Sequence, residues 1–192
     1  QPGRKSYAAG SMQDRAEPLL SVEKLSVSFS TRQGLLGGLA GNSNAFLALN
    51  GVDLSINAGE TVGIVGESGS GKSTLARSII RLNTPSGGSI RLDGQNVLGL
   101  GGEALTAFRR RVQMVFQNPY DSLNPRMTAL ESIAEPIWRH QLADRAGATK
   151  EAERLLDMVE LKRELGSRRP GQLSGGQCQR VGIARALALK PE

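Results

Sequence analysis

The 192-residue sequence predicts an α/β fold, and three observations support that prediction. A glycine-rich loop at 66–74 follows an apolar run at 61–65 that is typical of a buried parallel strand. A helical apolar stripe that includes Leu75 and Ile79 follows the loop. Apolar and polar residues alternate along 47–56, as in an antiparallel strand with one face in water.

The loop fits the phosphate-binding pattern Gly-x4-Gly-Lys-Ser/Thr at every fixed position. Its residues are Gly66, Glu67, Ser68, Gly69, Ser70, Gly71, Lys72, Ser73 and Thr74. Glycines let the backbone curl around phosphate oxygens with its N–H groups inward, at the positive end of a helix dipole. We expect Lys72 to reach the β- and γ-phosphates and the Ser73 hydroxyl to bind the nucleotide's Mg²⁺. The alternative is a flexible loop that fits the pattern by chance.

Composition limits the other classes of function. The net charge of +6 permits a nucleic-acid or anionic-membrane partner, but the arginines are scattered with few aromatic residues among them, which favours a solvated basic surface. Cys178 is the sole cysteine, so no internal disulfide forms and a reducing compartment is expected. No window approaches eighteen consecutive apolar residues.

The first half of the chain predicts strands around the loop. Residues 1–20 carry no apolar period and predict a linker or disordered arm. A strand with Val22, Leu25, Val27 and Phe29 follows, then a glycine-rich segment at 34–41 that we interpret as a mobile insertion. Ile90 and Leu92 predict a further strand that runs into a turn.

The second half predicts mainly helices. A helix with Leu105 and Phe108 precedes a strand at 112–116, and Gln117 stands where that strand ends. Because ligands bind at the carboxyl ends of parallel strands, we expect Gln117 and the loop at 66–74 to face one crevice. Beyond them, capping and helical spacing predict a helix that starts with the pair Thr128 and Glu131 and is kinked or ended by Pro136, and another with Ala152, Leu155, Leu156 and Val159.

A second motif, Leu173, Ser174, Gly175, Gly176 and Gln177, opens the last helix. Taken by itself it is a capping box, with Ser174 as N-cap and Gln177 three positions on. Together with the phosphate loop about a hundred residues upstream, it resembles the signature sequence of ATP-binding cassette (ABC) ATPases.

The resemblance covers residues 20–192 and implies a P-loop NTPase (RecA-like) core with an antiparallel β subdomain and an inserted α-helical subdomain. It implies a β subdomain and loop core at 21–117, a helical subdomain at 118–172 and the signature region at 173–192. Phe29 stands where the family has an aromatic residue that stacks on adenine, and an ordinary core aromatic is the alternative. Gln117 resembles the glutamine that approaches Mg²⁺ and the γ-phosphate.

Two departures from the family pattern stand out. Cys178 occupies a position that is usually basic, and we expect a mild effect. The sequence ends before the family's Asp-Glu pair and switch histidine, so the expected fold lacks the C-terminal part of the core, and the 192 residues are expected not to hydrolyse ATP unaided and to expose apolar surface. His140 lies in the helical region and is not expected to be the switch.

Residues 117–127 look like those of the bacterial dipeptide, oligopeptide, nickel and glutathione importers. That resemblance implies ATP and Mg²⁺ as cofactors and a second ATP-binding domain, membrane permease subunits and, indirectly, a periplasmic solute-binding protein as partners. It places the protein at the cytoplasmic face of the inner membrane, with no nucleic acid expected. The alternatives are a soluble ABC-type ATPase acting on nucleic acid or ribosomes, and a truncated nucleotide-binding remnant without hydrolysis.

Overall fold

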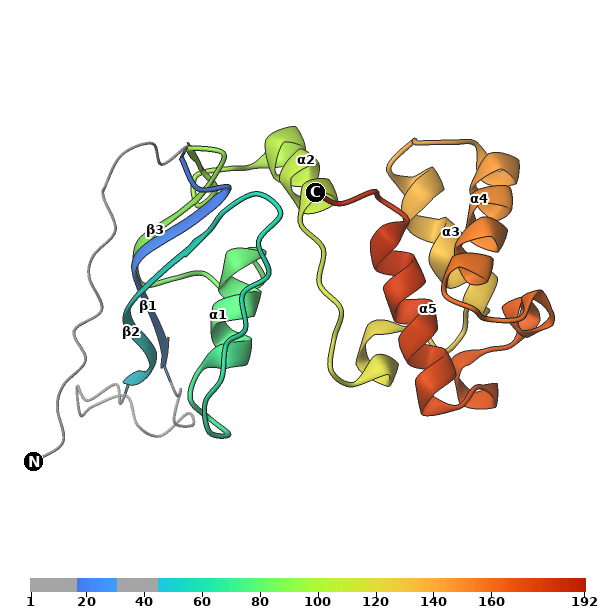
Figure 1. Ribbon diagram of the computed structural model, residues 1–192, viewed down its shortest axis with the longest axis horizontal. Helices are drawn as coiled ribbons and strands as arrows, with labels where there is room; N and C mark the ends of the chain where they lie inside the picture. Colours follow the sequence, from blue (N-terminus) through green and yellow to red (C-terminus); the bar gives the residue numbers. More distant parts are fainter. Residues whose placement is uncertain (1–16, 31–44) are drawn as a thin grey trace, which may run out of the picture. The chain divides into compact units, whose positions relative to one another are not determined.

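The computed structural model describes residues 17–30 and 45–192, and the chain divides into two compact units, Gln1–Leu100 and Gly101–Glu192 (Figure 1). The predicted insertion at 34–41 and most of the predicted arm at 1–20 lie outside the described residues. Within the described ranges, no helix combines the length and the apolar character that crossing a membrane requires.

The first unit contains an antiparallel sheet (Figure 1). The order of its strands is β2-β1-β3-β4. Its strands are β1 (Leu20–Ser30), β2 (Ala45–Ile56), β3 (Gly87–Leu92) and β4 (Gln95–Asn96). The three longer strands confirm the strands predicted from apolar spacing. The sheet's buried side chains include Val22, Leu25, Val27, Leu49, Ile90 and Leu92.

A bulge in β1 explains why its buried residues Val22 and Leu25 are three positions apart rather than two. The pairing register shifts between Val22 and Leu25, and Lys24 between them has a left-handed φ of 49°. The extra residue returns Leu25 to the buried face that Val22 occupies. Gly88 on the neighbouring strand lies so close that a Cβ there would meet the Lys24 carbonyl oxygen at 2.5 Å.

Helix α1 (Lys72–Ile79) confirms the predicted helix and begins within the phosphate-loop motif, with Leu75 buried and Ile79 half-buried. The predicted parallel strands at 61–65 and 112–116 are wrong, because neither segment is a strand in the structure. Val65 is 96% exposed, so the run at 61–65 is not buried either. A strand exists only through the ladder it makes with a neighbour, and apolar content alone does not supply one.

The second unit is helical, with α2 (Gly102–Arg111), α3 (Ala129–Arg139), α4 (Arg145–Met158) and α5 (Gly175–Leu187) (Figure 1). Three short 3-10 helices connect them: η1 (Pro119–Ser122), η2 (Arg163–Ser167) and η3 (Pro170–Gln172). One apolar core joins α3, α4 and α5, and its members include Ile133, Ile137, Ala152, Leu155, Leu156, Leu173, Cys178 and Val181.

The predicted capping box of α3 is confirmed. The Thr128 backbone N–H donates to Glu131 Oε2 at 2.7 Å, and the Glu131 N–H donates to Thr128 Oγ1 at 3.2 Å. Pro136 lies inside this helix, which continues to Arg139 before it ends. Proline at this position removes one N–H donor but does not end the helix.

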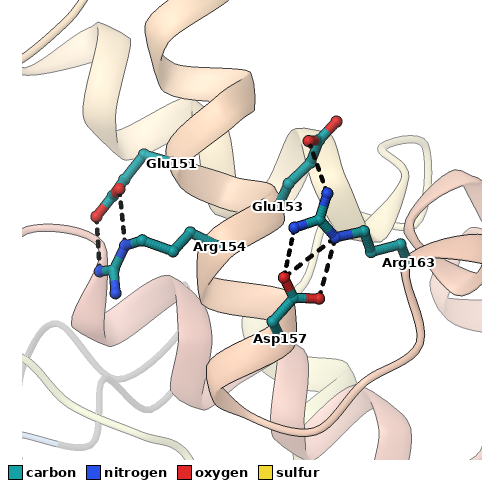
Figure 2. A network of polar contacts seen from close by, with 5 residues as sticks. All are labelled: Glu151, Glu153, Arg154, Asp157 and Arg163. Atoms are coloured by element: carbon teal, nitrogen blue, oxygen red, sulfur yellow. Dashed lines mark hydrogen bonds and ion pairs between the residues drawn. The ribbon is translucent and has the colours of Figure 1, made fainter.

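Arginines fasten the carboxyl end of α4. Arg163 donates through Nε to both carboxylate oxygens of Asp157, at 3.0 and 3.1 Å, and pairs with Glu153 at 3.4 Å (Figure 2). From α5, Arg180 donates to the carbonyl oxygens of Val159 and Glu160, at 3.2 and 2.8 Å. Val159 is the C-cap of α4 and Glu160 follows it, where carbonyl groups lack intrahelical donors, and Arg180 supplies a donor to both.

Candidate nucleotide-binding site

The phosphate loop curls through two glycines in left-handed conformations. Gly69 has a φ of 83° and Gly71 a φ of 94°, values that residues other than glycine rarely adopt. Between them the Ser70 N–H donates to the Glu67 carbonyl oxygen at 3.2 Å and closes a turn. The loop therefore bends back on itself before α1 begins.

Close packing around two glycines makes the loop a narrow cradle. A Cβ on Gly71 would lie 2.7 Å from Leu49 Cδ2 and 2.8 Å from the Ala48 carbonyl oxygen, both on β2. A Cβ on Gly66 would lie 2.8 Å from Ser70 Oγ, inside the curl. The glycines thus provide the close approach of backbone that a phosphate group requires, and the residues present fit a nucleotide polyphosphate.

The Lys72 side chain is hydrogen-bonded to the loop that forms this cradle. Its ammonium donates to the carbonyl oxygens of Gly66 and Glu67, at 2.8 and 2.7 Å, and to Ser70 Oγ at 3.2 Å. A lysine ammonium has three donors, so all three are directed at loop oxygens. A phosphate oxygen in the cradle would compete for the same donors.

The amino-terminal turn of α1 completes the cradle. Its first intrahelical bond runs from the Leu75 N–H to the Gly71 carbonyl oxygen, at 2.8 Å. The N–H groups of Lys72, Ser73 and Thr74 have no carbonyl one turn earlier to reach, as in any first helical turn. Ser73 is exposed at this tip, where its hydroxyl is available to a ligand or to a metal ion that a ligand carries.

Phe29 forms part of an exposed aromatic pair. It is 43% exposed, and its partner across the β1–β2 ladder is Phe46, which is 64% exposed. The alternative that Phe29 is an ordinary core aromatic is therefore wrong, whereas its stacking on adenine stays a prediction. Phe46 was not predicted, because its place opposite Phe29 depends on the pairing register of β1 with β2, which local sequence patterns do not specify.

The signature motif forms the tip of α5 in the second unit. The predicted capping box is confirmed: the Ser174 N–H donates to Gln177 Oε1 at 2.8 Å, and the Gln177 N–H donates to Ser174 Oγ at 3.3 Å. Ser174, Gly175 and Gly176 are exposed, and a Cβ on either glycine would meet nothing within 4 Å. Leu173 is buried beneath them and holds this tip to the core.

Gln117 is exposed in the second unit, two residues ahead of η1. Its approach to the phosphate loop, which belongs to the first unit, stays a prediction. Its part in a magnesium site with Ser73 stays a prediction too. In the part of the chain that the structure describes, no group of three or more histidine, cysteine, aspartate or glutamate side chains could hold a metal ion.

Contacts behind the motifs could not be read from the motifs themselves. Ala48 and Leu49 wall the phosphate loop from β2, about twenty residues upstream in sequence. Behind the signature motif, the Tyr120 hydroxyl donates to the Leu173 carbonyl oxygen at 3.4 Å. Burial raises the pKa of the nearby Cys178 thiol, and a side-chain hydrogen bond with Tyr120 opposes the rise.

The protein-family model described as "ABC transporter" matches residues 49–192, which are three quarters of the sequence and include both motifs. The chain belongs to the ABC transporter family. The predicted resemblance is thereby confirmed, and in this ABC chain each of the two motifs leads into the helix expected for it, α1 or α5.

Relatives of this ABC chain include peptide transporter components. It is 45% identical over 176 residues to a probable peptide ABC transporter ATP-binding protein of Sinorhizobium fredii, covering 92% of this chain and 49% of that protein. It is 46% identical to a putative oligopeptide transport ATP-binding protein of Bacillus subtilis, covering 93% of this chain and 52% of that protein. The chain therefore spans about half the length of these relatives.

A solved structure supports the same fold. The ATP-binding cassette MJ0796, in a dimeric post-hydrolysis state bound to ADP and phosphate, matches with a TM-score of 0.77 and 34% identity. The match covers 90% of this chain and 70% of that one. The predicted P-loop NTPase fold with an antiparallel sheet and a helical part is confirmed.

Proposed function

We propose that this chain is the nucleotide-binding part of a bacterial ABC importer ATPase, which couples ATP binding and hydrolysis to the uptake of peptides or similar small solutes. The observation that carries the proposal is the cradle at 66–74, in which the Lys72 ammonium donates to the carbonyl oxygens of Gly66 and Glu67 beside the first turn of α1. The names of the peptide-transport relatives support the class of solute.

Within the cradle, the chain's own residues bind and orient the triphosphate. The N–H groups at the tip of α1 donate to its phosphate oxygens, and the Lys72 ammonium exchanges the carbonyl oxygens of Gly66 and Glu67 for phosphate oxygens. Magnesium would be held through Ser73 and Gln117, and when bound it would neutralise charge on the phosphates. The exposed ring of Phe29 would stack on the adenine.

The signature tip supplies the other side of the site in a partner molecule. Ser174, Gly175 and Gly176 are exposed at a helix N-terminus with open space in front of both glycines, which suits close approach of a γ-phosphate. We propose that two ATP-binding domains close head to tail around two ATP molecules, and that hydrolysis lets them open. The dimeric state of the MJ0796 cassette agrees with such pairing.

The remaining partners follow from the importer function. We propose that membrane permease subunits receive the motion, that a periplasmic solute-binding protein delivers the solute to them, and that the ATPase is peripheral at the cytoplasmic face of the inner membrane. Nucleic acid is not among the proposed partners.

Equilibrium binding of a fluorescent ATP analogue tests the nucleotide site. Lys72→Ala should weaken binding by roughly ten- to a hundredfold, because it removes a charge-assisted donor from the phosphates. Lys150→Ala, which removes an exposed lysine on α4, is the matched control and should leave the affinity unchanged. Equal affinity for Lys72→Ala and the unmodified protein would refute the site.

Uptake by cells tests the importer function. The full-length protein, produced with its permease, should restore uptake of labelled di- and oligopeptides in cells that lack a peptide importer. Lys72→Ala should abolish that uptake. Uptake that is the same with Lys72→Ala would show that this ATPase does not drive it.

A further inference from the structure

The short segment that follows Gln117 is held against the signature helix α5. Within this segment, Asn118 caps η1 by accepting from the Tyr120 N–H at 3.3 Å, and Leu123 is buried in the same core as α5. The Ser122 hydroxyl donates to the Pro119 carbonyl oxygen at 2.9 Å and closes the turn. The segment is therefore a compact, internally bonded piece rather than a loose connection.

Two side chains join this piece to α5 at separate points. At one, the Tyr120 hydroxyl donates to the carbonyl oxygen of Leu173, the residue directly before the N-cap Ser174. At the other, nearly three turns along α5, Arg185 Nη1 donates to the Ser122 carbonyl oxygen. Two separated bonds between the same pieces resist rotation as well as separation.

Close packing accompanies these bonds. A Cβ on Gly182 would lie 3.6 Å from Ser122 Oγ, so α5 meets the segment at van der Waals distance on the face that carries Arg185. Arg185 is half-buried, which shields its bond from water and strengthens it. The Tyr120 ring is about half exposed, and its hydroxyl also reaches the buried Cys178 side chain.

We propose that Tyr120 and Arg185 are positioning residues that fix the signature tip Ser174, Gly175 and Gly176 relative to Gln117, so that the two move as one piece. This inference rests on the proposed function for its consequence in catalysis. Neither side chain needs to touch nucleotide, because each acts through a backbone carbonyl oxygen. Loss of these two side chains would leave the signature tip and Gln117 each intact but no longer fixed in position relative to one another.

Hydrogen exchange of backbone amides in the full-length protein tests the attachment without using ATPase activity. Tyr120→Phe keeps the ring and removes the hydroxyl, and it should raise exchange about tenfold in the first turn of α5. Arg185→Gln should raise exchange by a similar factor at 117–123, on the other side of the attachment. Arg154→Gln, which breaks the exposed pair with Glu151 on α4, is the matched control and should change neither segment (Figure 2).

A conservative variant separates positioning from folding. Arg185→Lys keeps one charged donor for the Ser122 carbonyl oxygen and should restore most of the protection that Arg185→Gln loses. Protection that stays unchanged in both segments would overturn the proposal. A rise spread equally over α3 and α4 in both Tyr120→Phe and Arg185→Gln would overturn it as well, since it would show general destabilisation.

Steady-state kinetics of the full-length protein provide the functional readout. Tyr120→Phe and Arg185→Gln should lower kcat about tenfold and leave KM for ATP unchanged, because the phosphate loop is untouched. An increase in KM with unchanged kcat would overturn the positioning role. Absence of ATPase activity in the unmodified protein would instead refute the proposed function, and the exchange experiment would still decide whether the two side chains hold the segments together.

Discussion

Replacing Gly71 by alanine tests whether the phosphate loop depends on a glycine at the start of α1. The backbone there has a φ of 94°, and a left-handed conformation costs a residue with a Cβ roughly 1–2 kcal/mol. The new methyl group would also lie 2.8 Å from the Ala48 carbonyl oxygen, a backbone atom that moves only with β2. Overpacking of this kind costs a further 1–3 kcal/mol, roughly. We therefore expect the free energy of unfolding to fall by about 2–5 kcal/mol.

Gly69→Ala is the matched control for this prediction. Gly69 has a φ of 83°, close to that of Gly71, but a Cβ there would meet nothing within 4 Å. It should therefore show the conformational cost of about 1–2 kcal/mol without the steric cost. Urea unfolding of the two variants measures the difference, and fluorescent ATP binding should be lost in Gly71→Ala in the same preparation. If Gly71→Ala is no less stable than Gly69→Ala, the wall formed by β2 does not constrain the loop.

Three further predictions concern the sheet, a helix cap and the helical core. Gly88→Ala should lower the free energy of unfolding by roughly the sum of backbone strain and overpacking, several kcal/mol, because the new Cβ would meet the Lys24 carbonyl oxygen at 2.5 Å. Urea unfolding measures this loss of stability. A loss below about 1 kcal/mol would contradict the prediction. Hydrogen bonds from the Thr128 backbone N–H, and secondly from its hydroxyl, hold the pKa of Glu131 below its ordinary range. The stability that the ionised Glu131 contributes is therefore complete above the ordinary glutamate pKa of about 4.3, and it is lost as pH falls through the lower pKa of the folded state. Unfolding measured across that range should show a smaller acid loss in Glu131→Gln, and identical profiles would contradict the coupling. Cys178, buried and with its thiol pKa raised by burial, should resist a thiol reagent in the native protein and react on unfolding; rapid native labelling would contradict its placement.

The sequence predicted those parts of the fold that depend on local patterns. The apolar spacing of 47–56 predicted β2, and the pair Thr128 and Glu131 predicted the start of α3. The capping box works because neighbours in the chain supply the interaction, and the alternation in β2 works because one of its faces is buried. The helices that the two motifs lead into were likewise predicted, α1 from the phosphate loop and α5 from the signature.

The parts that failed depend on partners far along the chain. The run at 61–65 has the composition of a buried strand, yet a strand needs a neighbouring ladder that composition does not report. The left-handed Lys24 gives no local sign, because its partners lie far along the chain: its N–H donates to Asp53 Oδ1 at 2.7 Å, and Gly88 packs against its carbonyl oxygen. The attachment of Tyr120 to Leu173 spans 53 positions and joins two motifs that the sequence shows only separately.

The lysine that lies across the phosphate loop has a consequence for how tightly the loop selects its ligand. Because Lys72 is bonded to three oxygens of its own loop, the curl is preorganised by protein atoms, and little conformational entropy remains to be lost when a ligand arrives. Entry then becomes an exchange of oxygen partners around one ammonium. A highly charged anion that displaces the carbonyl oxygens gains binding free energy, because its hydrogen bonds to the ammonium are charge-assisted on both sides. A neutral molecule of the same size gains no binding free energy from this exchange. Discrimination for charge is therefore built into the contacts that shape the loop.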